Sequence, residues 1–144
     1  MVFSEQSITL ESAQYLASKT LQACQKSGFS TVVTVVDQRG SQKVVLADDG
    51  SFPHAIETSL RKARTAASRR IPSGSVIDDN DHEPTISDIF HAIGLTSLGG
   101  GVPIIKDGKV IGGVAVAGAP GENAAGDDYD ILCINKGLES LGLL

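Results

Sequence analysis

The sequence contains few aromatic residues and few cysteines. It has no Trp, two Tyr and four Phe, so only 4% of its 144 residues are aromatic. Aromatic platforms of the kind on which nucleic-acid bases stack are therefore scarce. The same scarcity means that Val, Ile, Leu and Ala must supply most of the core of the folded protein.

An excess of positive charge and long apolar runs are also lacking. Twelve basic residues against 17 acidic ones give a formal net charge of -5. Because nucleic-acid-binding domains carry a basic surface, we expect no nucleic-acid partner. No apolar run approaches the roughly 20 residues that cross a bilayer, and residues 1–12 lack the tracts of a signal peptide. We therefore expect a cytoplasmic protein that does not bind membranes.

The two cysteines, Cys24 and Cys133, lie far apart in the sequence, each within a helical pattern of apolar neighbours. This separation matches neither a zinc-binding motif nor the dense disulfide framework of a small secreted domain. We expect two buried free thiols. A soft ligand for iron and a redox role are the alternatives.

The residues that are present predict one domain, because 1–144 is long enough for one core and too short for two ordinary domains. Apolar residues at helical spacing predict three helices, and runs of β-branched residues around turns predict two hairpins. The helices are expected at 10–24, from 51 to 70 and from Asp127 onward, and the hairpins at 29–46 and 102–117.

The order of these elements determines the predicted fold. Hairpins join antiparallel strands, so a doubly wound parallel sheet is excluded. With a further strand at 95–98, we expect an antiparallel sheet of about five strands flanked by helices, an α+β layer architecture of profilin-like kind. In the last strand Ile111, Gly113, Ala115 and Ala117 share one side, where a packed helix or a flat ligand could approach the backbone.

Several segments in this order resemble the haem-binding domain of the GlcG and HbpS type. The resemblance covers nearly the whole chain and rests on 62–66 (KARTA), 99–104 (GGGVPI), 107–112 (DGKVIG), 116–118 (VAG) and a final helix opened by Asp127. It implies a homo-oligomer that binds haem or iron, in some members linked to haem degradation. It does not imply one reaction, because a shared fold can host different functions.

The helix predicted from residue 51 has two different faces. Its expected buried stripe is Phe52, Ile56, Leu60, Ala63 and Ala67. Its expected polar stripe is His54, Thr58, Arg61, Thr65 and Ser68.

The polar stripe contains the first candidate ligand of iron. His54 lies in the first turn, where the helix dipole disfavours a charged imidazolium and leaves the neutral ring free to bind a metal. Thr58, Arg61 and Arg64 would then suit the haem propionates. The alternative is a solvated helix face on which Glu57 and Arg61 form an ordinary ion pair.

Two more histidines are weaker candidates. His91 lies in a predicted helical turn at 87–92 and is either a second iron ligand or a packed histidine. His82 lies between Asp81 and Glu83, where carboxylates and imidazole suit a hard cation or iron. That loop lacks the spacing of a calcium-binding loop, and we expect it to be solvated.

The glycine run and one aspartate each have a structural and a functional interpretation. Gly99, Gly100 and Gly101 lack the spacing of nucleotide-binding motifs. They either satisfy a backbone constraint or, as the resemblance implies, line the ligand pocket. Asp127 either caps the last helix, as Asp128 beside it also could, or is a catalytic or iron-binding carboxylate.

No motif in the sequence identifies a nucleophile together with its base. Three functions stay open. The first is binding of haem or iron. The second is a small enzyme acting on a small carbonyl or phenolic metabolite, with His54 or Asp127 moving a proton. The third is a non-catalytic assembly or sensor subunit.

Overall fold

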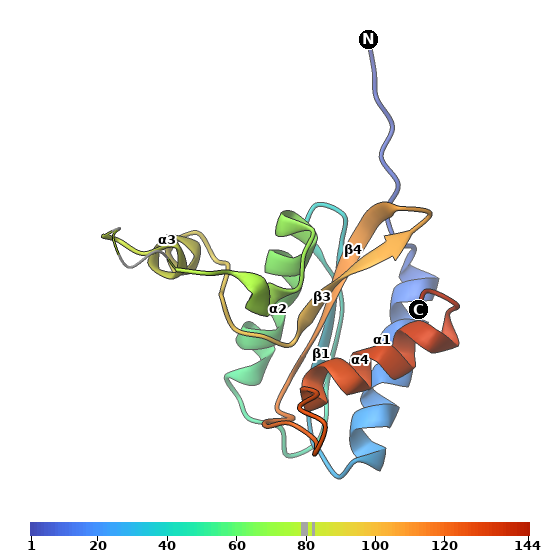
Figure 1. Ribbon diagram of the computed structural model, residues 1–144. Helices are drawn as coiled ribbons and strands as arrows, with labels where there is room; N and C mark the ends of the chain where they lie inside the picture. The colour runs from blue at the N-terminus through green and yellow to red at the C-terminus, as the bar shows by residue number, and fades with distance from the viewer. Residues whose placement is uncertain (79–80, 82) are drawn as a thin grey trace.

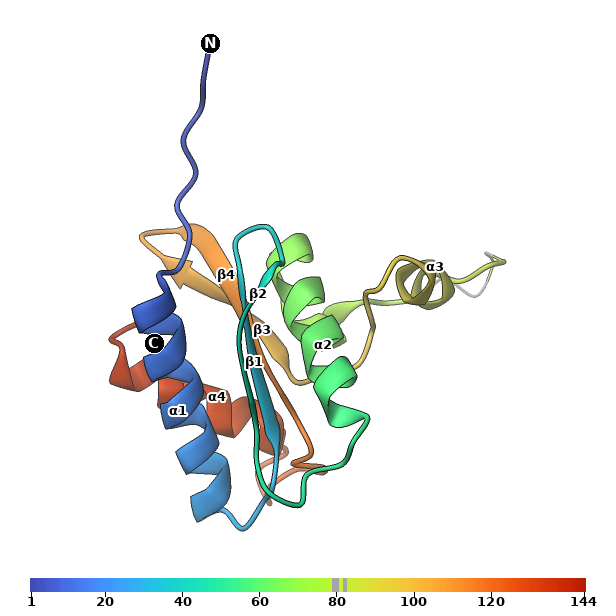
Figure 2. The ribbon, with the colours of Figure 1, turned by 180° about the vertical axis from the view of Figure 1, so that it is seen from behind.

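A computed structural model describes residues 1–78, 81 and 83–144 and shows one sheet with helices on both faces (Figures 1 and 2). The strands are β1 (Val32–Asp37), β2 (Gln42–Ala47), β3 (Gly101–Lys106) and β4 (Lys109–Ala117). The long helices are α1 (Leu10–Lys26), α2 (Ala55–Arg69) and α4 (Tyr129–Ser140). Helices α1 and α4 cover one face of the sheet and α2 covers the other.

The sheet is antiparallel throughout, with strand order β2-β1-β4-β3. This confirms the α+β fold and both hairpins, but the sheet has four strands, so the expectation of about five is wrong. Residues 95–98 form no strand because side chains of other elements form hydrogen bonds with their backbone groups. The Thr96 amide donates to Thr65 Oγ1 (2.9 Å), and Ser73 Oγ donates to the Leu98 carbonyl (2.7 Å).

The helix starts follow capping chemistry, with two corrections. Thr9 caps α1, just before the predicted start at residue 10, since its hydroxyl accepts the Ser12 amide. Helix α4 is capped by Asp128, whose carboxylate accepts two first-turn amides, so the expected cap at Asp127 is wrong. Helix α2 begins after His54 and not at residue 51, because residues 53 and 54 form a turn first.

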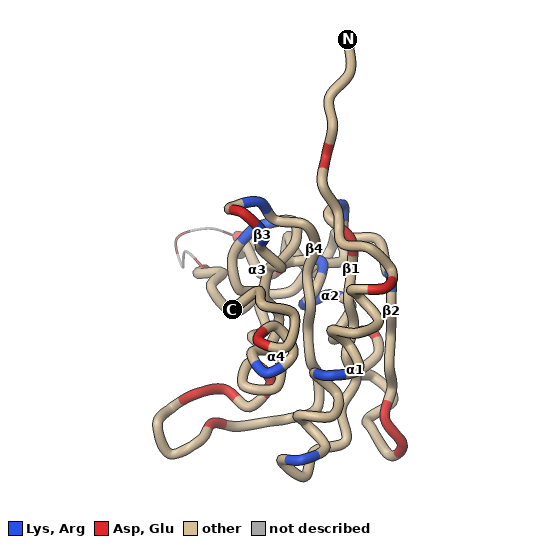
Figure 3. Tube along the Cα trace, turned by 90° about the vertical axis from the view of Figure 1, so that its right-hand side faces the viewer, with Lys and Arg blue, Asp and Glu red and all other residues tan. Residues whose placement is uncertain are grey.

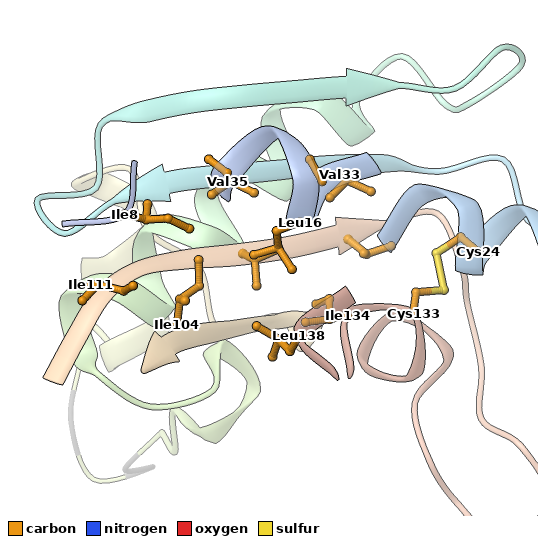
Figure 4. Close-up of a cluster of buried hydrophobic side chains, with 14 of the residues drawn as sticks. Ile8, Leu16, Cys24, Val33, Val35, Ile104, Ile111, Cys133, Ile134 and Leu138 are labelled. Atoms are coloured by element: carbon orange, nitrogen blue, oxygen red, sulfur yellow. A yellow bond between two sulfur atoms is a disulfide. The ribbon is translucent and has the colours of Figure 1, made fainter. Parts of the chain in front are cut away.

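The larger part of the core lies between the sheet and the pair α1 and α4 (Figure 4). Its fully buried side chains come from both central strands and both helices and include Val33, Val35, Val114, Val116, Leu16 and Ile134. Burying each such side chain contributes roughly 1.5–3 kcal/mol, so this layer is the main source of stability.

On the opposite face α2 packs close to the backbone of β4. A Cβ at Gly113 would collide with the carbonyl oxygen of Ala63, and Ala115 packs in the same cluster. The small strand surface therefore receives a packed helix and not a flat ligand. Ile111 lies instead in the core beneath α1 and α4, because a register shift at Ile104/Ile105 reverses the alternation.

The predicted buried stripe of α2 is wrong in its first two members. Phe52 and Ile56 are 59% and 47% exposed, whereas Ser59 and Thr65 are fully buried. The buried hydroxyls are satisfied, since Ser59 Oγ lies 2.6 Å from Thr34 Oγ1 and Thr65 Oγ1 donates to a helix carbonyl. The helix therefore turns a small, partly polar face to the sheet and leaves apolar side chains outside.

A disulfide joins Cys24 of α1 to Cys133 of α4, so the expectation of free thiols is wrong (Figure 4). The two Cα atoms are 5.2 Å apart, within the usual range for a disulfide. The reason is the packing of α1 beside α4, which brings together residues 109 apart in the sequence.

The middle of the segment between α2 and β3 projects from the body of the molecule, whereas its two ends, with Ser73 and Thr96 buried, pack against it (Figures 1 and 2). The segment contains a short 3-10 turn, η1 (Ser73–Ser75), and a helix, α3 (Ile86–Ala92), close to the predicted turn at 87–92. We call residues 71–98 the arm. Among the described residues, no helix has the length and apolar character needed to span a bilayer.

Candidate functional site

A cavity of about 260 Å³ lies at the start of α2. Its walls come from the first turns of α2 and α4 and from the chain that leaves β4, and they comprise Phe52, His54, Ala55, Thr58, Lys62, Ala117, Gly118, Pro120 and Asp130. A larger hollow of about 600 Å³ lies between the N-terminal segment and the β3–β4 turn, but it contains no histidine. The smaller cavity combines an imidazole with a buried ionisable pair, so it is the better candidate.

An ion pair forms the floor of this cavity. Lys62 Nζ lies 3.2 Å from Asp130 Oδ2 and donates to the carbonyl of Val116 at 3.0 Å. The other carboxylate oxygen, Oδ1, accepts the Ala119 amide at 3.0 Å. Both side chains are buried. Burial raises the pKa of Asp130 to about 6, against the opposing effect of Lys62.

Sequence reasoning missed this pair. Lys62 follows Thr58 by four residues, and this spacing placed it on the cavity side of the helix. Asp130 gave no signal beyond being an acidic residue in the first turn of a helix. Because the two are 68 residues apart, only the tertiary fold brings them together.

The glycine run packs behind the pair and does not line the cavity. A Cβ at Gly100 would lie 2.8 Å from both Lys62 Nζ and Asp130 Oδ2, and Gly100 has a φ of +114° that favours glycine. A Cβ at Gly101 would lie 2.5 Å from the Lys62 carbonyl oxygen. This placement favours the backbone-constraint interpretation.

His54 and Thr58, which the helical spacing placed on one face, both lie at the cavity. The His54 ring is exposed and stacks on Phe52, with ring centroids 5.7 Å apart and an interplanar angle of 22°. Thr58 Oγ1 donates to the His54 carbonyl at 3.0 Å, which fixes the first turn. Within the described part of the chain, no hydrogen bond holds the His54 ring, so its nitrogens can bind a ligand.

The two arginines of the predicted site point elsewhere. Arg61 pairs with Glu57 at 2.9 Å and donates to the carbonyl of His91 at 3.1 Å. Arg64 donates to the Gly40 carbonyl at 3.2 Å. Residues 54, 58 and 62 therefore face the cavity, whereas Arg61 faces the arm. The Glu57–Arg61 ion pair, expected if this helix face is solvated and binds no ligand, is present.

The remaining predicted residues are not brought to the cavity. His91 is exposed on the arm, with its Nδ1 2.7 Å from the Ser87 carbonyl oxygen. Asp127 is exposed in the loop before α4 and accepts from Asn123 Nδ2 at 3.1 Å. His82 lies outside the described residues. Among the residues that the structure describes, no group of three His, Cys, Asp or Glu is arranged for a metal ion.

Relatives with similar sequences identify the family. The family model described as haem degrading protein HbpS-like matches residues 8–132. Protein GlcG of Escherichia coli K12 is 35% identical over 111 residues, which is 73% of this chain and 80% of GlcG. An uncharacterised 15.0 kDa protein of Citrobacter freundii is 32% identical over 117 residues, or 77% of this chain and 80% of that protein.

Solved structures agree in fold. A crystal structure of HbpS is 33% identical, covers 98% of this chain and 94% of its own, and has a TM-score of 0.83. Klebsiella pneumoniae protein ORFY is 24% identical with a TM-score of 0.83, and the match covers 99% of this chain and 96% of ORFY. PduOC, solved as a complex with haem, is 18% identical with a TM-score of 0.79, and the match covers 93% of this chain and 94% of PduOC. On the strength of the match over 8–132, this chain belongs to the HbpS-like family of haem-degrading proteins.

Proposed function

We propose that this protein binds haem at the cavity beside α2, with His54 as the ligand of the iron. The observation that carries the proposal is the exposed His54 imidazole at the cavity, free of hydrogen bonds within the described chain and stacked on Phe52. HbpS-like family membership and the haem complex of PduOC support haem as the ligand class. We also propose a homo-oligomer, as the resemblance implies.

The residues present fit a flat, largely apolar metal complex. Imidazole is a common ligand of iron, and Phe52, Ala117 and Pro120 give the cavity apolar walls. Bound haem would supply an iron centre for redox or oxygen chemistry, while the chain's own residues bind and orient it.

A haemin titration followed by absorbance tests the proposal. We expect the wild-type protein to develop a Soret band with saturable binding, and His54→Ala to shift that band and weaken binding roughly tenfold or more. His91→Ala is the matched control, because His91 is also exposed but lies on the arm. Equal spectra and affinities for wild type and His54→Ala would contradict the proposal.

A second candidate, a small enzyme, is favoured by the buried carboxyl at the cavity floor. With its pKa raised to about 6, Asp130 can accept or release a proton near neutral pH. Lys62 beside it supplies a positive charge for a small carbonyl or phenolic substrate. If this candidate is correct, calorimetry will detect binding of small phenols or keto acids, and Lys62→Met will abolish that binding.

A further inference from the structure

Lys62 differs from every other lysine of the chain in its surroundings. All seven lysines lie within the described residues, and only Lys62 is buried, with a side chain 7% exposed. The other six are distributed over α1, three strands and α4, around the molecule (Figure 3). Burial disfavours the charged form of an amine, and buried lysines are the ones that enzymes use as nucleophiles.

The amine of Lys62 is held between packed backbone and the cavity beside α2. Gly100 packs against it, since a Cβ there would lie 2.8 Å from Nζ, and Lys62 also lines the cavity. Nζ donates to the Val116 carbonyl and to Asp130, and an ammonium group has three hydrogens. Within the described part of the chain, the third hydrogen has no partner, so the amine has a bonding position left for a ligand.

Asp130 is placed to exchange protons with this amine. Its Oδ2 lies 3.2 Å from Nζ, and its Oδ1 accepts the Ala119 amide, which holds the carboxyl group in place. Because both charges are removed from water, moving the proton from the ammonium to the carboxylate costs less here than at the surface. The pKa of Asp130, raised by burial to about 6, agrees with this role. The fold thus brings together a nucleophile and a base that are 68 residues apart.

We propose that Lys62 condenses with a small uncharged aldehyde in this cavity to form an imine. The proposal deepens the second candidate function, a small enzyme acting on a carbonyl compound, and rests on it.

The condensation needs no group beyond this pair and the aldehyde. Lys62 first passes a proton to Asp130, and the neutral amine attacks the carbonyl carbon. A C–N bond forms, and the carbonyl oxygen takes the proton from Asp130. Asp130 then accepts a proton from the nitrogen and returns it to the departing hydroxyl group. Water leaves, and the protonated imine keeps the single positive charge beside the Asp130 carboxylate.

The size and charge of the cavity select the substrate class. At roughly 30 Å³ for each water molecule, about 260 Å³ is the space of roughly eight or nine waters, which suits a molecule of a few carbon atoms. A carboxylate on the substrate would face Asp130, which disfavours keto acids. Arg61 and Arg64, which could compensate such a charge, bond to the carbonyls of His91 and Gly40 instead.

Reductive trapping tests the proposal on the wild-type protein. Cyanoborohydride reduces an imine to a stable secondary amine, so a lysine that has condensed with butanal keeps a butyl group. At neutral pH we expect peptide mapping to show labelling of Lys62 about tenfold or more faster than of the other six lysines, because amines in water stay protonated. Butanamide, which is similar in size but forms no imine, should slow labelling of Lys62 alone.

Lys62→Met and Lys43→Met are matched variants of a buried and an exposed lysine. We expect intact-mass spectra to lose the fast phase of labelling in Lys62→Met and to retain it in Lys43→Met, with circular dichroism showing that both are folded. The peptide map of the wild type decides the question if Lys62→Met does not fold.

Two results would overturn the imine: labelling of Lys62 no faster than of Lys43 in the wild type, or labelling that butanamide does not slow. Calorimetry of butanal binding then separates the two proposals. Binding without fast labelling would overturn the imine and keep the small-enzyme candidate, whereas the absence of both would overturn both.

Discussion

At the scale of single residues, the pair Lys62–Asp130 is a buried ion pair at the floor of the cavity. Each charge is removed from water, and each is compensated by the other and by a backbone group. Removing one member of such a pair typically costs about 3–5 kcal/mol, because the other charge is left buried alone. The pair therefore links the stability of the fold to the protonation state of the cavity.

The pKa of Asp130 predicts a pH dependence of stability. Its value rises from 3.8 to about 6 on folding, so between these values the folded state binds more protons than the unfolded state. The free energy of unfolding contributed by this group therefore falls as pH rises from about 4 to about 6 and is constant above. The full change corresponds to roughly 3 kcal/mol.

Urea unfolding of wild type and Asp130→Asn across this pH range isolates the effect. The other carboxyl groups contribute equally to both proteins, so we expect the stability of wild type relative to Asp130→Asn to decrease between pH 4 and pH 7. A constant difference would show that Asp130 titrates with its ordinary pKa.

Local chemistry could be predicted from the sequence at this scale, and distant pairing could not. The Thr9 cap and the shared helix face of His54 and Thr58 depend on neighbours within one helical turn. The partner of Lys62 depends on how α4 meets the end of β4, which no spacing in the sequence reveals.

At the scale of elements, close approach of α2 to the sheet determines which glycines are essential. Gly101→Ala would place a Cβ 2.5 Å from the Lys62 carbonyl oxygen, so α2 or β3 must move. We expect thermal unfolding to show a loss of roughly 1–3 kcal/mol.

Gly99→Ala in the same glycine run is the control. Its Cβ would meet its nearest atom, Asp128 Oδ2, at 3.8 Å, an ordinary contact. We expect a change within about 0.5 kcal/mol. Equal losses for both variants would contradict the packing described for the run.

The disulfide between α1 and α4 should contribute strongly to stability, because it joins two residues that are 109 apart in the sequence and so closes a long loop. For long loops, loss of a disulfide typically costs about 2–5 kcal/mol. We expect the double variant Cys24→Ala/Cys133→Ala to melt roughly 5–15 °C below wild type in calorimetry. Reductant should lower the melting temperature of wild type and leave that of the double variant unchanged. If reductant has no effect on wild type, the contribution is negligible.

The hairpins and helix order were predictable because turn residues and periodicity are local signals. The rotation of α2 was not, since apolar periodicity favoured burying Phe52 and Ile56. Burial of Ser59 and Thr65 instead depends on hydrogen bonds made by their hydroxyl groups. Ser59 bonds to Thr34 of β1, and Thr65 accepts the Thr96 amide of the segment before β3. The sheet likewise has four strands and not five, because side-chain hydrogen bonds replace strand pairing at residues 95–98.

At the scale of the whole molecule, the disulfide bears on where the protein is found. Disulfides persist mainly in oxidising compartments, so the Cys24–Cys133 bond is at odds with the expected cytoplasmic location. That location stays a prediction.

The central claim, that His54 ligates haem iron, is tested most directly by chemical rescue. His54→Gly removes the ring at a position where glycine is an acceptable helix cap. The haemin spectrum of this variant should differ from that of wild type, and added imidazole should restore the wild-type spectrum by occupying the vacated position. A wild-type spectrum for His54→Gly in the absence of imidazole would contradict the claim.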